Sequence, residues 1–251
     1  MNSFYSQQAG CTVRWHDLPG TGDPVVFIHG LGCASSYEYP RVVHDPLFGA
    51  RRAILIDLPG SGYSDKPEHY SYKTTGQAYV VVELIDHLKL DAFWLYGHSM
   101  GGSIAIEAAG LLATRVKGLM VSEPNFHAGG GMFSRSIAAQ TEQHFLTQGY
   151  DVMLSAETTA WAGCLKSNAP YAVWRGASSL VQGVEPDWAT QFLSLACPVT
   201  LIFGEQSLPD DDVKNLKQKG VEVKIIPAAG HSMSWENPSA LAQTLAGCMV
   251  V

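Results

Sequence analysis

Short runs of apolar residues, each followed by a turn rich in Gly or Pro, alternate along the chain with longer helical patterns. The apolar runs are Pro24–Ile28, Ala53–Ile56, Ala92–Tyr96, Gly118–Val121, Val199–Phe203 and Val221–Ile226. The helical patterns are Thr75–Leu88, Ser99–Leu112, Asp211–Lys219 and Pro238–Cys248. Continuous apolar strands that alternate with helices are typical of a parallel sheet covered by helices on both faces. The segment through Leu18 alternates apolar and polar positions and predicts an antiparallel hairpin at the sheet edge.

The interval between Pro124 and Pro198 is too long to be a single crossover between strands. Its composition, rich in Trp and Ala, predicts several short helices. In an α/β protein such an insertion usually covers the ligand end of the sheet. We therefore expect a core formed by residues 1–124 and 197–251, with a helical cap at residues 125–196. The alternative is an extra packing layer with no role in binding.

The composition and net charge of the chain exclude several classes of protein. A chain of 251 residues with 46% hydrophobic and 16% charged residues is long enough for one large buried core, which excludes disorder. The net charge of −7 argues against a surface that binds nucleic acid or an anionic membrane. The five cysteines are scattered, so we expect no disulfide framework or metal site. The first residues show no secretory signal, and we expect a cytoplasmic location.

The strongest local motif is Gly97-His-Ser-Met-Gly101, placed between an apolar strand and a helical pattern. A G-x-S-x-G sequence in this context forms a sharp turn that presents its serine, here Ser99, at a helix N-terminus. Free N–H groups there favour developing negative charge. The similar sequence around Ser232 lacks the second glycine and is interrupted by Pro238, so Ser99 is the better candidate nucleophile.

Two further segments complete the candidate chemistry. His29-Gly-Leu-Gly32 follows the first parallel strand, and the N–H groups of Leu31 and Met100 are the expected donors to a tetrahedral oxyanion. Nine histidines compete for the role of general base. His231 follows the last strand and is preferred, while His127 and His144 in the insertion remain as rivals.

With Asp57-Leu-Pro-Gly-Ser-Gly-Tyr-Ser64, these motifs resemble the α/β-hydrolase superfamily over essentially the whole chain. The resemblance implies a mostly parallel eight-stranded sheet (the α/β-hydrolase fold) with an inserted cap and a Ser–acid–His triad. Relatives usually carry the acid shortly after the seventh strand, where this chain has Ser207. Some members place it after the sixth strand, where this chain has Glu123, so we expect Glu123 to orient His231. Asp210 and Asp211 stay open as alternatives.

These residues predict a serine hydrolase that cleaves a small, mostly apolar acyl compound, most simply a carboxylic ester, through an acyl-enzyme. A serine rather than an aspartate nucleophile argues against dehalogenase or epoxide hydrolase chemistry. No metal or organic cofactor is expected. Thioester, lactone or C–C bond hydrolysis would use the same groups, and a receptor that keeps the triad but turns over negligibly is the alternative from another class. The expected substrate-binding residues are Gly30, Trp161, Trp174 and Trp235, and the expected aromatic roof is Phe126, Phe133, Trp161, Tyr171, Trp174 and Trp188.

Overall fold

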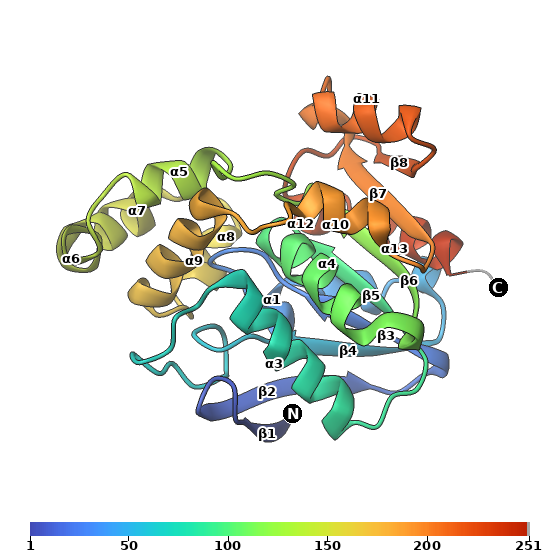
Figure 1. Cartoon of the computed structure of the whole chain (residues 1–251), viewed down its shortest axis with the longest axis horizontal. Coiled ribbons are helices and arrows are strands. Elements are labelled where there is room, and N and C mark those ends of the chain that lie inside the picture. Colours follow the sequence, from blue (N-terminus) through green and yellow to red (C-terminus); the bar gives the residue numbers. More distant parts are fainter. Residues whose placement is uncertain (250–251) are drawn as a thin grey trace.

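A computed structural model describes residues 1–249 and contains one eight-stranded sheet in the order β1-β2-β4-β3-β5-β6-β7-β8 (Figure 1). The strands are β1 (Asn2–Ser6), β2 (Cys11–Leu18), β3 (Thr21–Ile28), β4 (Arg51–Asp57), β5 (Phe93–His98), β6 (Val116–Ser122), β7 (Val199–Gly204) and β8 (Glu222–Ile226). β2 runs antiparallel to both β1 and β4, and β4, β3, β5, β6, β7 and β8 pair in parallel. The expected fold class is therefore confirmed, including the antiparallel hairpin at the edge. The end of the predicted core, residues 250 and 251, lies outside the described residues.

Helices cover both faces of this sheet. On one face lie α3 (Thr74–His87), α4 (Met100–Leu112), α10 (Trp188–Ser194) and α11 (Asp211–Gln218); on the other lie α1 (Ser35–Glu38), α2 (Pro40–Val43), α12 (Met233–Glu236) and α13 (Pro238–Cys248). The remaining helices are α5 (Met132–Ala138), α6 (Glu142–His144), α7 (Tyr150–Ala156), α8 (Trp161–Leu165) and α9 (Pro170–Gln182), which gather at one end of the molecule (Figure 1). No helix within residues 1–249 has the length and apolar character needed to cross a membrane.

The central strands are apolar throughout because both of their faces are covered. Val26 and Ile28 point to the face that carries α3 and α4, while Val25 and Phe27 point to the face that carries α13. All four side chains are fully buried. This two-sided burial, which favours continuous apolar runs over alternation, is what makes the strands readable from the sequence.

Helix α10 does not belong to the cap in which the sequence analysis placed it. The sequence placed residues 125–196 in the insertion, yet Trp188 and Phe192 of α10 pack in the main core beside α4. The Trp188 indole N–H donates a hydrogen bond of 2.8 Å to the buried carboxylate of Glu107 on α4. The last helix of the expected insertion thus covers the sheet, and we use "cap" below for α5 to α9.

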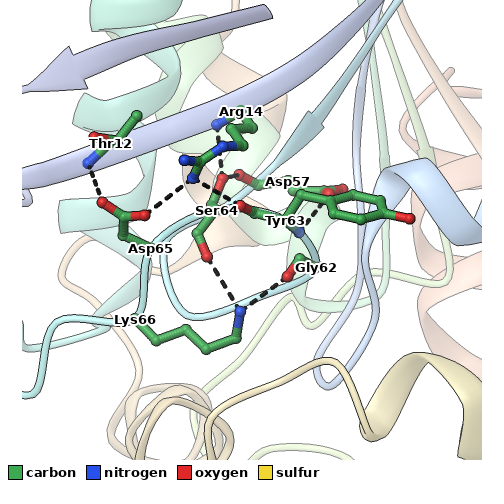
Figure 2. A network of polar contacts seen from close by, with 8 residues as sticks. All are labelled: Thr12, Arg14, Asp57, Gly62, Tyr63, Ser64, Asp65 and Lys66. Carbon is green, nitrogen blue, oxygen red and sulfur yellow. Dashed lines mark hydrogen bonds and ion pairs between the residues drawn. The ribbon is translucent and has the colours of Figure 1, made fainter. Parts of the chain in front are cut away.

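The loop after β4 is held by its own polar contacts (Figure 2). The Asp57 carboxylate accepts hydrogen bonds from the Ser36 N–H and from the Tyr63 N–H, at 2.9 and 3.0 Å. Lys66 Nζ donates to the carbonyls of Gly62 and Ser64, which closes the turn. These contacts give the Asp57–Ser64 segment a structural role, because they occupy its carboxylate and its backbone carbonyls.

Candidate active site

Ser99 lies in a strained turn between β5 and α4. Its backbone φ of +52° belongs to a region that costs a non-glycine residue about 1–3 kcal/mol. A Cβ on Gly97 would come within 2.3 Å of the Gly101 carbonyl oxygen, and one on Gly101 within 2.3 Å of the Ile28 carbonyl oxygen. Only glycine fits at either position, so the two glycines of the motif allow the turn that presents Ser99. Ser232 borders the same cavity, but it has a negative φ and leads into the single-turn helix α12.

His231 and Glu123 are joined directly. His231 Nδ1 donates a hydrogen bond of 2.7 Å to Glu123 Oε2, and the Gly204 N–H donates one of 2.9 Å to Glu123 Oε1. Burial opposes ionisation of Glu123, but these two hydrogen bonds hold the pKa of the carboxyl below its ordinary value. With the proton on Nδ1, the Nε2 atom of His231 is left to accept a proton.

Ser99 and His231 border one cavity, although no hydrogen bond joins Ser99 Oγ to the imidazole within residues 1–249. Such contacts are often long without substrate and shorten in the reacting complex. The ring of His98 lies 4.7 Å from the His231 ring, and its Nδ1 is 2.9 Å from Ser122 Oγ. Burial lowers the pKa of His98 to about 3. His98 therefore packs against His231 as an uncharged ring.

The turn after β3 provides a free backbone donor. Among the described residues, neither the Leu31 N–H nor the Met100 N–H has an acceptor. The orientation of the Gly30–Leu31 peptide is fixed through the Gly30 carbonyl, which lies 2.9 Å from His29 Nδ1 and accepts the Cys33 N–H at 3.2 Å. His29 Nε2 accepts the Leu58 N–H, so Nδ1 carries the proton of this neutral, fully buried ring. This positioning role of His29 was missed in the sequence, where only its place in the turn was recognised.

These groups surround a cavity of about 460 Å³ between the core and the cap. Its apolar lining consists of Leu31, Cys33, Pro124, Met132, Phe133, Trp161, Leu180, Phe203 and Trp235. Its carboxylates are Glu38, Glu123, Glu157, Asp210 and Asp212, and no Lys or Arg within residues 1–249 borders it. The side chains available here suit acid–base and acyl-transfer chemistry on an uncharged ligand.

Three of the four expected substrate-binding residues lie at the cavity. Gly30, Trp161 and Trp235 line the cavity, whereas Trp174 does not. The Trp174 indole N–H donates to the Gln140 carbonyl at 2.9 Å, and its ring packs within the cap. Of the expected aromatic roof, Phe133 and Trp161 border the cavity; Phe126, Tyr171, Trp174 and Trp188 do not, so the prediction of six roof residues is corrected to two.

The alternative acids have other partners. Asp210 caps α11 by accepting the Val213 N–H at 3.0 Å, and Asp211 is the first residue of that helix. Asp212 and Asp187 both contact His127, at 3.2 and 3.0 Å, which leaves that rival histidine outside the cavity. Ser207, at the usual position of the acid, borders the cavity and helps to lower the pKa of Glu123.

Glu38 is a cavity residue that the sequence did not reveal. Its side chain is only 2% exposed; Ser234 Oγ donates to Oε1 at 3.0 Å, and Oε2 has no hydrogen-bond partner within the described chain. Burial raises the pKa of Glu38 to about 7, and the Ser234 hydrogen bond offsets this only in part. The one signal in the sequence was its position in the segment that follows the His29–Gly32 turn.

This buried carboxyl should make the folded state sensitive to pH. Because the folded pKa is raised from 4.5 to about 7, native Glu38 keeps a proton that the unfolded chain releases, and stability is lost as pH rises through that window. The full effect corresponds to about 3 kcal/mol. Glu38→Gln should therefore gain stability relative to the wild type between pH 5 and pH 8, measured by urea unfolding. The exposed control Glu185→Gln should show no such gain, and an equal difference at both pH values for Glu38→Gln would contradict the prediction.

The fold and this cavity define an α/β-hydrolase. Residues 25–244 match the Alpha/beta hydrolase family, and the chain belongs to that family. The relatives that match part of the sequence include hydrolases and haloalkane dehalogenases by name, and the solved structures with the same fold include esterases and lactonases.

Individual relatives resemble parts of the chain or its fold. The chain is 36% identical over 115 residues (45% of this chain, 30% of the relative) to the dihydrolipoyllysine-residue acetyltransferase component of the acetoin cleaving system of Pseudomonas putida. It is 31% identical over 113 residues (45% of this chain, 41% of the relative) to a 2-hydroxy-6-oxo-2,4-heptadienoate hydrolase, also of P. putida. The match thus spans less than half the length of these two relatives. A thermophilic esterase from Thermogutta terrifontis has the same fold, with a TM-score of 0.80 and 21% identity over 99% of this chain and 97% of the esterase.

Proposed function

We propose that this protein is a serine hydrolase of small, mostly apolar and uncharged acyl esters. The observation that carries the proposal is the 2.7 Å hydrogen bond between His231 and Glu123, in the cavity that Ser99 also borders. The nucleophile, base and orienting acid follow the carboxyl ends of β5, β8 and β6, so the sheet brings to one edge the three groups that a Ser–His–acid triad needs.

In the proposed reaction, Ser99 Oγ attacks the ester carbonyl while His231 Nε2 takes the hydroxyl proton. The carbonyl oxygen becomes an oxyanion that accepts hydrogen bonds from the Leu31 and Met100 N–H groups. Collapse of this intermediate breaks the bond to the alcohol, which leaves with the proton from His231. A water molecule, deprotonated by the same imidazole, then attacks the acyl carbonyl. The bond from that carbon to Ser99 Oγ breaks, Ser99 takes the proton back from His231, and the acid leaves. Glu123 holds the imidazole in the Nδ1–H tautomer and balances its charge when it is protonated.

The charge of the cavity supports an uncharged substrate. An anionic group placed there would meet several carboxylates, and no Lys or Arg among residues 1–249 lines the cavity to pair with it. Burying such a group without a partner costs several kcal/mol. A carboxylate-bearing compound of the kind in the heptadienoate hydrolase's name therefore fits this cavity poorly.

The test is a series of p-nitrophenyl esters of graded acyl length. Burying one methylene contributes about 0.8 kcal/mol, so kcat/KM should rise roughly fourfold per carbon from acetyl to hexanoyl until the cavity is full. A hexanoyl ester that ends in a carboxylate should be a much poorer substrate. A flat or falling series would contradict the apolar acyl site. A single burst without repeated turnover would favour the receptor alternative.

A further inference from the structure

The turn that carries the Leu31 N–H is held from two sides. From the core, His29 and the Cys33 N–H fix the Gly30 carbonyl. From the cap, the Trp161 indole N–H donates to the Leu31 carbonyl at 3.1 Å, and Asn168 Nδ2 donates to the Cys33 carbonyl at 3.1 Å. Trp161 begins α8, and Asn168 follows that helix by less than one turn. One short segment of the cap therefore binds backbone carbonyls of the turn at two points.

The two side chains are themselves fixed by packing and by further hydrogen bonds. Asn168 is buried, donates a second hydrogen bond to the Cys164 carbonyl at 2.8 Å, and accepts one from Ser61 Oγ at 2.6 Å. The Trp161 ring and Leu165 approach Gly32 so closely that a Cβ on that glycine would lie 3.0–3.1 Å from both. Gly32 has a φ of +65°, a conformation that other residues rarely adopt. The segment is thus seated directly on the turn.

We propose that Trp161 and Asn168 are positioning residues, through which the cap keeps the Leu31 N–H aimed at the oxyanion. The inference rests on the proposed function, because it assigns the cap a part in the same acyl transfer. Holding the Leu31 carbonyl restricts rotation about this residue, so the preceding N–H keeps its direction without reorganisation when charge develops. Trp161 acts here through its N–H; its ring is also part of the cavity wall.

Trp161→Phe removes the N–H while keeping an aromatic ring, and Trp174→Phe is its matched control. Trp174 likewise donates its indole N–H to a backbone carbonyl, that of Gln140, but away from the turn and the cavity. We expect Trp161→Phe to lower kcat on the order of tenfold, the equivalent of one hydrogen bond of about 1.4 kcal/mol. The loss should be the same for acetyl and hexanoyl esters, and KM should change little. The rate constant for labelling by a fluorophosphonate should fall by a similar factor. Trp174→Phe should leave both rates within twofold of the wild type.

The outcomes separate positioning from the other roles of Trp161. A loss that grows with acyl length would mean that Trp161 serves only as cavity wall, and it would overturn the inference, as would unchanged kcat and labelling. If Trp161→Phe does not fold by circular dichroism, 3-benzothienylalanine inserted at position 161 keeps the shape of Trp without its N–H, and the same tenfold loss is required. A wild type that is neither labelled nor active on any ester would overturn the proposed function and this inference with it. An active wild type with an unaffected Trp161→Phe overturns this inference alone.

Discussion

Glu123→Gln is expected to lower kcat by roughly 10³–10⁴-fold, as loss of the orienting carboxylate does in serine hydrolases. The Gly204 N–H contacts Oε1 and needs an acceptor, so the amide oxygen of Gln should take that position. Its NH₂ group then faces His231 Nδ1 and donates to it. That arrangement places the imidazole proton on Nε2, where it prevents His231 from accepting the proton of Ser99. The measurement is kcat for one short-chain ester, with circular dichroism to show that the variant is folded.

Asp210→Asn and Asp211→Asn are the matched controls for this prediction. Asn caps helices as well as Asp does, so α11 should remain intact in the first variant. Neither carboxylate hydrogen-bonds to His231, and each variant should keep kcat within a few-fold of the wild type. A large loss in either variant, combined with near-normal activity of Glu123→Gln, would show that the orienting acid lies in the loop after β7. The assignments of Ser99 and His231 would be unaffected.

The sheet could be predicted from the sequence because its strands are buried on both faces. A strand such as β3, with Val25 to Ile28 fully buried, reads as one apolar run and cannot be confused with an amphipathic helix. The ends of the strands do not follow from the apolar runs alone. The run ending at Tyr96 continues as strand through Gly97 and His98, since those two residues pair with β6 although neither is apolar.

The site was predictable where backbone geometry demands particular residues. A Cβ atom at Gly97 or Gly101 would lie less than 2.5 Å from a backbone carbonyl oxygen, so both positions require glycine. The two glycines therefore mark the position of Ser99 in any sequence that folds this way. Glu123 was predicted as the acid because Ser207 stands at the usual position, because some members of the family place the acid after the sixth strand, and because strand ends meet at one edge of the sheet. Its backbone φ of +41° shows that this position too is strained, a feature that the sequence does not reveal.

Residues placed by tertiary packing could not be predicted. Trp161 and Trp174 are both tryptophans of the insertion, and only the packing of the short cap helices decides that the first borders the cavity and the second does not. Glu38 contacts Ser234 although the two residues are 196 positions apart in the sequence. No periodicity marks such a pair, because each residue sits in a single-turn helix whose direction depends on its neighbours.

Ser99→Ala should abolish labelling by a fluorophosphonate and lower kcat by about 10⁵-fold or more, because the oxyanion donors and substrate binding that remain supply only about 10³–10⁴-fold acceleration over water, a small part of the whole. Peptide mapping of the labelled wild type should place the adduct on Ser99. Ser232 is the internal control: it borders the same cavity and lies next to His231, but its backbone lacks the strained turn, and the helix that starts directly after it, α12, is only one turn long. Ser232→Ala should therefore keep its labelling and most of its activity. Labelling that survives Ser99→Ala and disappears in Ser232→Ala would show that access to His231, rather than the geometry of the turn after β5, selects the nucleophile.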